Sequence, residues 1–245
     1  MTRGSTSAQS FRDDDDDDDP AGSTSEFKFK LVVVFYGVFE WALRVSVYDS
    51  GSGRWGEIIS TTTYSDCFKP SVLVGNKLYW LIRQQRGCNF LQFDVDRHAM
   101  AIIKMSDDVM HVPDGAHVQP LRTKDGGLGF AIVWKRRMQL WGKTFISGNV
   151  VRGVLEKTVE LDQLLPMKPA LTAMERQPSI VGYDEENNVI FLWTNVGVFM
   201  IKLESMEFTK VFEDTSIRKY FPFASFFDAA AGNDTSSLLS HYTNK

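Results

Sequence analysis

Short apolar segments separated by tight polar turns recur along most of the chain, and this pattern limits the possible folds more than any other feature. Ser71–Val74 and Lys77–Ile82 flank Gly75-Asn76, as expected for two strands joined by a hairpin turn. Four further pairs follow the same arrangement: Phe90–Asp94 with Ala99–Ile103, Leu128–Trp134 with Met138–Trp141, Ile180–Tyr183 with Val189–Trp193, and Val198–Leu203 with Phe208–Phe212. Helical periodicity is limited to Leu161–Leu165, just before Pro166. We therefore expect a nearly all-β protein.

Some of these segments resemble one another closely enough to indicate an internal repeat. The shared order of apolar strand, polar turn and second strand occurs in Val45–Ile58, Phe90–Ile102 and Phe199–Val211. We place a fourth copy at Met138–Val159, with a long loop at Gly148-Asn149, and an apolar pair before each copy, such as Phe27–Tyr36 before the first. Such repeats predict an all-β, β-propeller-like fold with about four blades of antiparallel strands. A non-repeating β-sandwich with the same turns is the alternative.

About four blades is the lower limit for a propeller, and an open stack would leave strand edges exposed. The ring is therefore expected to be either unusually small or incomplete. The apolar run Leu31–Phe39 begins soon after a polar N-terminal segment, with no blade before it. We expect the chain to be a truncated piece of a larger propeller protein.

Composition sets the boundaries of the folded domain. Residues 1–26 are small and polar, contain the run of seven aspartates Asp13–Asp19, and have few apolar side chains to offset the entropy of ordering. We expect a disordered acidic tail there, with a weak calcium or basic-partner site as the alternative. Residues 229–245 are again small and polar, which predicts a flexible C-terminal tail. The propeller-like domain would then occupy residues 27–228.

The distribution of charge and apolar residues argues against two classes of partner. The formal net charge of -4 arises from the Asp run, and the remaining chain is close to neutral, so it lacks the basic field that nucleic acid requires. No segment approaches the roughly 20 apolar residues of a membrane helix, and no apolar stretch typical of a signal peptide opens the sequence. We expect no nucleic acid and no membrane as partner, and a cytoplasmic location, a nuclear one, or both.

Residues able to bind metals are scattered. Cys67 and Cys88 have neither a CxxC motif nor a nearby histidine pair, and they predict two reduced thiols rather than a zinc site or a disulfide framework. The histidines lack the i, i+4 spacing that places two ligands on one helix face. They are His98, His111, His117 and His241, and only the second and third could meet, in a loop without a third ligand. We predict solvated loop histidines, no metal and no cofactor.

The sequence lacks recognised catalytic motifs. It contains no Gly-x-Ser-x-Gly nucleophile elbow and no phosphate-binding P-loop. Lys124–Gly129 is rich in glycine but precedes a strand, so it predicts a turn and not a phosphate site at a helix N-terminus. Asp184–Glu186 could suggest a carboxylate pair, but its place between two strands predicts a solvated hairpin tip. We therefore assign no catalytic, cofactor-binding or metal-binding residue, leave the partner-binding residues unassigned, and expect a protein that is not an enzyme.

The tryptophans lie mainly in predicted strands: Trp41, Trp55, Trp80, Trp134, Trp141 and Trp193. A platform on which bases or sugars stack would need an exposed ring and, for nucleic acid, basic neighbours. Only the turn Lys135–Arg137, next to Trp134, supplies such neighbours. We expect the tryptophans to pack in the core or between blades.

Several multi-residue segments resemble the C-terminal region of plant F-box proteins, particularly the large sets found in grasses. The similarity extends, in order, over about residues 27–227. The segments that carry it are Val47–Trp55, Lys69–Trp80, Leu91–Arg97, Gly126–Phe130, Leu140-Trp141, Glu160–Leu165, Ile180–Tyr183, Asn187–Trp193 and Gly197–Met200.

The resemblance implies an F-box-associated, propeller-like domain that holds a protein substrate for an SCF-type ubiquitin ligase. The F-box itself would be a leucine- and proline-rich helical segment that precedes the propeller and docks on a Skp-type adaptor. The sequence contains no such segment, and the Asp run stands in its place. A Skp-type adaptor and a cullin are therefore expected as partners only if an F-box exists upstream.

Together, the pattern and the resemblance predict a non-catalytic module that binds a protein substrate of unknown identity. The partner would contact loops at the blade ends, a strand edge or the groove between blades. One alternative is a truncated copy without an F-box and with no ligase role. The other is a small β-propeller enzyme or carbohydrate binder.

Overall fold

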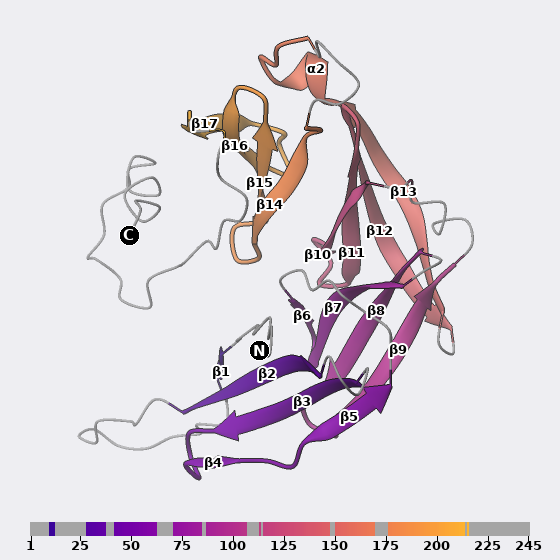
Figure 1. Ribbon diagram of the computed structural model, residues 1–245, viewed down its shortest axis with the longest axis vertical. Helices are drawn as coiled ribbons and strands as arrows, with labels where there is room; N and C mark the ends of the chain where they lie inside the picture. The colour runs from indigo at the N-terminus through magenta and orange to yellow at the C-terminus, as the bar shows by residue number, and fades with distance from the viewer. Residues whose placement is uncertain are drawn as a thin grey trace, which may run out of the picture. The chain divides into compact units, whose positions relative to one another are not determined.

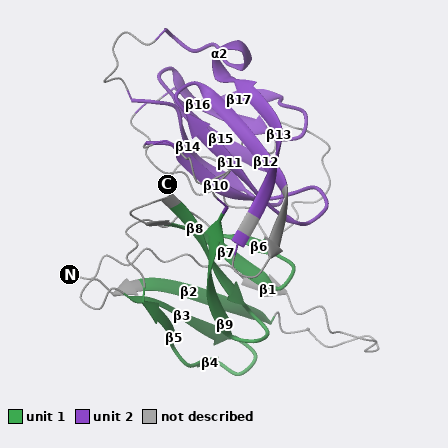
Figure 2. Cartoon of the chain, turned by 90° about the vertical axis from the view of Figure 1, so that its right-hand side faces the viewer, with its two compact units in different colours: residues 1–105 green, residues 106–245 purple. Residues whose placement is uncertain are grey.

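The chain forms two compact units, residues 1–105 and 106–245, and each is built from antiparallel strands (Figure 1, Figure 2). The computed structural model describes residues 10–12, 28–37, 42–62, 71–84, 87–106, 113, 115–147, 150–169, 176–213 and 215. Each unit contains two blades in which nearly every strand pairs with the next along the chain. This meander is the strand order of a propeller blade.

Unit 1 contains blades 1 and 2. Blade 1 consists of β1 (Ser10–Arg12), β2 (Phe29–Gly37), β3 (Ala42–Asp49), β4 (Arg54–Trp55) and β5 (Ile59–Thr62), with β4 and β5 both paired to β3. Blade 2 consists of β6 (Val72–Val74), β7 (Lys77–Gln84), β8 (Gly87–Asp94) and β9 (Ala99–Met105). Strand β1 lies within the segment 1–26 and pairs with β2, Ser10 opposite Leu31. The boundaries 1–26, 27–228 and 229–245 stay predictions.

Unit 2 contains blades 3 and 4. Blade 3 consists of β10 (His117–Arg122), β11 (Leu128–Trp134), β12 (Arg137–Ser147) and β13 (Val150–Glu160), and it is followed by the short helix α2 (Leu161–Leu164). Blade 4 consists of β14 (Ser179–Asp184), β15 (Val189–Thr194), β16 (Gly197–Lys202) and β17 (Phe208–Phe212).

The all-β class and the four antiparallel blades are confirmed, and so are the five hairpins and the short helix that the sequence predicts. Gly148-Asn149, where a long loop is predicted, lies outside the described residues, and the pairing of β12 with β13 extends to Ser147 and Val150. The basic turn is shorter than expected, because Arg137 already pairs with Trp134.

One type of hairpin turn occurs in both units. In this turn, four residues lie between two paired residues. Asp49 pairs in this way with Arg54, Asp94 with Ala99, and Asp184 with Val189. The turn after β16 has the same length. The last turn residue has a positive φ in each case: Gly53 (66°), His98 (48°), Asn188 (51°) and Met206 (61°). Where the first residue is Asp, its carboxylate accepts backbone N–H groups of the turn, as Asp94 does from Arg97 at 2.9 Å. The repeat that the sequence shows is therefore partly a repeat of turn chemistry.

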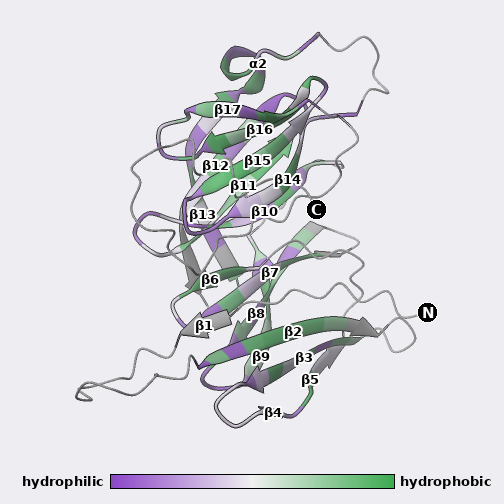
Figure 3. Ribbon diagram, turned by 90° about the vertical axis from the view of Figure 1, so that its left-hand side faces the viewer, coloured by the Kyte–Doolittle hydropathy of each residue, from purple (hydrophilic) through white to green (hydrophobic). Residues whose placement is uncertain are grey.

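The blades bury apolar strand faces. In unit 1, one cluster joins side chains of β2 and β3 to side chains of β7 and β8, including Val34, Val45, Trp80 and Phe93, all fully buried. In blade 4, the cluster centres on Phe191 and Val198, and every residue of β14 and β15 is buried. Hydrophobic colour accordingly runs along β2 and β15 (Figure 3).

Candidate protein-binding groove

A groove opens within unit 2, between one end of blade 3 and the adjoining turns of blade 4. Its volume is about 320 Å³. Blade 3 supplies most of the lining, and blade 4 supplies Asn188, Leu203 and Glu204. The blade 3 residues are Leu121, Arg122, Thr123, Lys124, Asp125, Gly129, Leu140, Trp141 and Glu156. We call this set of residues the unit 2 groove.

Gly129, which lines the unit 2 groove, has a second glycine as its neighbour on the next strand. Gly129 of β11 and Gly142 of β12 lie side by side, because a Cβ on Gly129 would come within 3.8 Å of the Gly142 Cα. The same Cβ would come within 2.8 Å of the Trp141 carbonyl oxygen. Leu121 is the partner of Gly129 across the β10–β11 ladder, so its side chain lies on the same face of the sheet. Two neighbouring positions of the sheet therefore lack a side chain, and Gly129, Gly142 and Leu121 are all buried.

The carboxylate of Glu156 lies over Gly142 because β13 contains a bulge. Leu140 pairs with Lys157 and Trp141 with Leu155, so Glu156 is an extra residue with no partner on β12. A bulge redirects the side chain of the inserted residue. The Glu156 carboxylate occupies the space that a Cβ on Gly142 would take.

Tyr183 joins the two blades beside the groove. Its hydroxyl accepts a hydrogen bond from the Arg122 backbone N–H at 3.1 Å and donates one to Asn188 Oδ1 at 3.3 Å. The residue is 6% exposed, and burial raises the pKa of its phenol well above the ordinary value. The phenol therefore stays protonated and keeps its role as donor throughout the neutral range.

The rim of the groove carries a second link between the blades. Lys124, in the loop after β10, forms an ion pair with Glu204 in the turn after β16. The two side chains are 67% and 69% exposed, so solvent screens their attraction. Next to them, the Thr123 hydroxyl donates to the Asp125 carboxylate. Arg122 and Glu156 form no ion pair within the described part of the chain.

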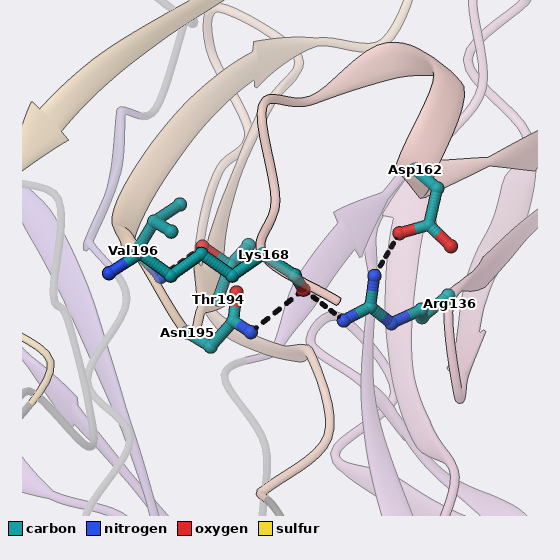
Figure 4. A network of polar contacts seen from close by, with 6 residues as sticks. All are labelled: Arg136, Asp162, Lys168, Thr194, Asn195 and Val196. Atoms are coloured by element: carbon teal, nitrogen blue, oxygen red, sulfur yellow. Dashed lines mark hydrogen bonds and ion pairs between the residues drawn. The ribbon is translucent and has the colours of Figure 1, made fainter. Parts of the chain in front are cut away.

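A polar network links the opposite ends of the same two blades (Figure 4). The Lys168 carbonyl oxygen accepts hydrogen bonds from the Arg136 guanidinium and from Asn195 Nδ2, the latter at 3.0 Å. Arg136 also pairs with Asp162 of α2, and its carbonyl oxygen accepts from the Leu161 N–H at 2.7 Å. The segment after α2 is thus fastened to the β11–β12 turn and to the β15–β16 turn. These contacts stabilise the junction, while the groove occupies its other end.

The structure describes three of the six candidate metal ligands, and each lies in a different strand or turn. His98 is exposed at the end of the β8–β9 turn and stacks on Phe93, with ring centroids 6.4 Å apart. His117 is partly buried in β10, so its prediction as a solvated loop residue is wrong. Cys88 is a buried thiol in β8. Cys67, His111 and His241 lie outside the described residues. In the described part, no three His, Cys, Asp or Glu side chains are grouped to hold a metal ion.

The two candidate loops have different outcomes. The turn predicted at Lys124–Gly129 forms over Lys124–Gly126, with the Gly126 N–H donating to the Thr123 carbonyl oxygen at 2.9 Å, whereas Gly129 already belongs to β11. The solvated tip expected at Asp184–Glu186 is wrong for Asp184, which is 8% exposed. Its carboxylate accepts from Glu186 N–H at 3.1 Å, and from Asn187 N–H at 3.2 Å and Asn187 Nδ2 at 2.8 Å. Asp184 is therefore a structural residue of the turn.

The tryptophans divide between core and surface. Trp80 and Trp193 are buried as expected, and Trp141 is partly buried, with its ring stacked on Phe130 at 5.7 Å. The packing role predicted for each is wrong for Trp55 and Trp134, which are 54% and 37% exposed. Trp41 lies outside the described residues.

The basic turn beside Trp134 carries little unpaired charge. Lys135 Nζ lies 4.3 Å from the centre of the Trp134 ring. Arg136 pairs with Asp162, and Arg137 pairs with Glu160 at 2.7 Å. These acids therefore neutralise both arginines of the turn.

The sequence did not indicate Glu156 as a groove residue. Its direction depends on the pairing of β12 with β13, which a list of strand residues does not reveal. Gly142 is the one available signal, because a glycine inside an apolar strand often marks a bulge or a close approach. No helix among the described residues is long and apolar enough to cross a membrane.

Comparison with known proteins connects this architecture to a family. A family model described as F-box protein AT5G49610-like, beta-propeller, matches residues 18–226. No curated protein matches the sequence. A solved structure of the extracellular domain of the one component system BT4673 from B. thetaiotaomicron is similar at a TM-score of 0.38 and 10% identity. That similarity covers 85% of this chain but only 28% of the other, and it carries no argument about function.

Proposed function

Because the chain belongs to the F-box protein AT5G49610-like β-propeller family, we propose that it is a non-catalytic module that holds a segment of a protein partner in the unit 2 groove. The observation that carries the proposal is the groove itself. Leu121, Leu140 and Leu203 give it apolar side chains, and loop and turn residues with polar groups surround them, which favours binding of a segment of a partner.

The scaffold around the groove supports this role. The groove lies at blade ends, where loops and turns offer side chains on a rigid sheet. Tyr183 and the network around Lys168 fix blades 3 and 4 to each other on both sides. A partner would therefore bind a largely preformed site, so this chain would lose little conformational entropy on binding.

Family membership suggests a finer role. The partner would be the substrate of an SCF-type ubiquitin ligase, and this chain would be its substrate-recognition domain. A Skp-type adaptor and a cullin would join only through an F-box upstream of this segment. Without one, the chain would act as an interaction module with no ligase role. The site of action would be the cytoplasm, the nucleus or both.

Affinity selection from a random peptide library, with the whole chain as bait, tests the binding role. Selected peptides would then be titrated against two variants that introduce the same charge. Leu140→Arg places a guanidinium in the groove, and Thr209→Arg places one on exposed β17 as the control. We expect Leu140→Arg to weaken binding about tenfold or more, since about 1.4 kcal/mol corresponds to a factor of ten.

Thr209→Arg should leave the affinity unchanged. Circular dichroism melting would verify that both variants are folded. A library that yields no binder, or binders that tolerate Leu140→Arg, would contradict the proposal. Adaptor binding is a separate test: co-precipitation of a purified Skp-type adaptor with this chain would contradict its dependence on an upstream F-box.

A further inference from the structure

We propose that the unit 2 groove selects its partner by a basic residue, an arginine or a lysine, whose cation pairs with Glu156. The methylene stem of that residue would lie against Leu121, Leu140 and Leu203. This inference rests on the proposed function and adds the chemical class of the residue that is bound.

Glu156 is the carboxylate that the fold leaves available in the groove. Glu204 is engaged by Lys124, and Asp125 accepts the Thr123 hydroxyl. Glu156 has no ion-pair partner in the described part of the chain, although the bulge in β13 directs it over Gly142. A carboxylate in this position offers up to two acceptor oxygens to an incoming cation.

The surroundings of Glu156 favour a long side chain over a simple ion. Leucine side chains from both blades line the groove, so part of any ligand there loses contact with water. Arginine and lysine bury a methylene stem along apolar surface while the charged end reaches a polar partner. Arginine has the further advantage of a planar fork that binds a carboxylate through two hydrogen bonds.

The cations of the groove are less suited to bind an acidic partner. Lys124 is already paired with Glu204. Arg122 lies close enough to Tyr183 to influence the pKa of its phenol, and it belongs to the exposed end of β10 rather than to the glycine pair. With three acids and two bases among the lining residues, the groove favours a cationic ligand.

Gly142 provides a variant that moves the Glu156 carboxylate without removing its charge. The three atoms nearest to a Cβ at this position all belong to the far end of the Glu156 side chain, which can rotate away. Gly142→Ala should therefore fold normally and displace the carboxylate. The same change at Gly129 would meet the Trp141 carbonyl oxygen, so it is not a suitable variant.

The first test uses N-acetyl-arginine methylamide as the probe, with binding followed by the amide chemical shifts of Gly129 and Gly142. We expect saturable shifts with the wild type and an affinity at least about fivefold lower with Glu156→Gln and with Gly142→Ala. Glu213→Gln, which removes a carboxylate that is 91% exposed and lies outside the groove lining, is the matched control and should retain binding. Absence of saturable shifts in the wild type, or equal affinity in Glu156→Gln, would overturn the inference.

The second test separates this inference from the proposed function. Peptides selected on the wild type should share a basic residue, and replacing that residue by glutamine should cost about tenfold in affinity. In Glu156→Gln the same replacement should have little effect. If peptides require Leu140 but no basic residue, the proposed function stands and this inference fails. If no peptide binds, both fail.

Discussion

The two units join their blades in different ways. In unit 1, the faces of blades 1 and 2 merge in one apolar cluster that contains fully buried Val34, Trp80 and Phe93. In unit 2, the contacts beside the groove are a tyrosine hydrogen bond and an exposed ion pair. One apolar cluster therefore spans both blades of unit 1, whereas beside the groove of unit 2 the blades are linked by polar contacts, next to the buried strands β10 and β14.

This difference explains why the binding site is expected in unit 2. Close-packed apolar side chains leave no room for a partner. Removing a methylene group from such packing lowers the free energy of unfolding. Hydrogen bonds between blade ends fix geometry without filling the space between them. A repeat scaffold can thus use one junction for stability and another for binding.

The largest expected effect tests the apolar junction. Phe93→Ala should lower the free energy of unfolding by about 3–5 kcal/mol, because it removes a fully buried ring and leaves a cavity. Phe208, which is 42% exposed on β17, provides the control. Phe208→Ala should lower the free energy of unfolding far less than Phe93→Ala does. Urea unfolding followed by amide hydrogen exchange would measure both.

Exchange in the Phe93→Ala variant should accelerate in blades 1 and 2 together, since the cluster contains strands of both. If exchange accelerates in blade 2 alone, the two blades do not form one cooperative body, and the comparison with unit 2 loses its basis.

The second effect tests the polar junction. Tyr183→Phe should cost about 1–2 kcal/mol, because the Arg122 N–H and Asn188 Oδ1 each lose their partner in the phenol hydroxyl. The loss should appear in exchange rates around Arg122 and Asn188. A variant as stable as the wild type would show that the hydroxyl does not fasten the blades.

The same residue gives a pH dependence. The folded-state pKa of Tyr183 is raised, chiefly by burial, so the protonated phenol is favoured by folding. Its contribution is fully present below the ordinary tyrosine pKa of about 10 and decreases as pH rises above it. Above this pH the wild type should lose stability more steeply than Tyr183→Phe, as equilibrium unfolding at a series of pH values would measure. Parallel curves for the two proteins would contradict this assignment.

The third effect concerns a feature that the units share. Asp94→Ala and Asp184→Ala should each cost about 1–2 kcal/mol, because each nearly buried carboxylate satisfies N–H groups of its own turn. Thermal melting of both variants would test whether turn chemistry is equivalent in the two units. A much larger loss for one of them would show that its turn also supports the junction between blades.

The hairpins could be predicted because their causes are local. Gly75-Asn76 lies between two apolar runs and needs no distant contact to form a turn. The blade count followed from repeating such pairs. The groove depends instead on pairing between strands: the bulge at Glu156 exists only because Trp141 pairs with Leu155.

The burial of a side chain was similarly hard to predict where it depends on the conformation of the surrounding backbone. Asp184 resembles a surface acid in the sequence, yet the N–H groups of its own turn surround the carboxylate. Trp55 has the composition of a core residue but lies on the two-residue strand β4, with little structure to cover it. The sequence therefore indicates the repeated scaffold better than the particular surface on which partners would bind.

The smallest expected effect concerns the ion pair at the rim of the groove. The Lys124–Glu204 pair joins the blades across the rim, but both side chains are exposed, so a double-mutant cycle should give a coupling energy below about 1 kcal/mol. Salt should reduce even that value, because exposed charges are screened. If the coupling were several times larger and insensitive to salt, the rim would be a structural junction like the apolar cluster of unit 1. A small, salt-sensitive coupling would instead mean that the rim pair adds little to the junction, which then depends on Tyr183 and on the network around Lys168.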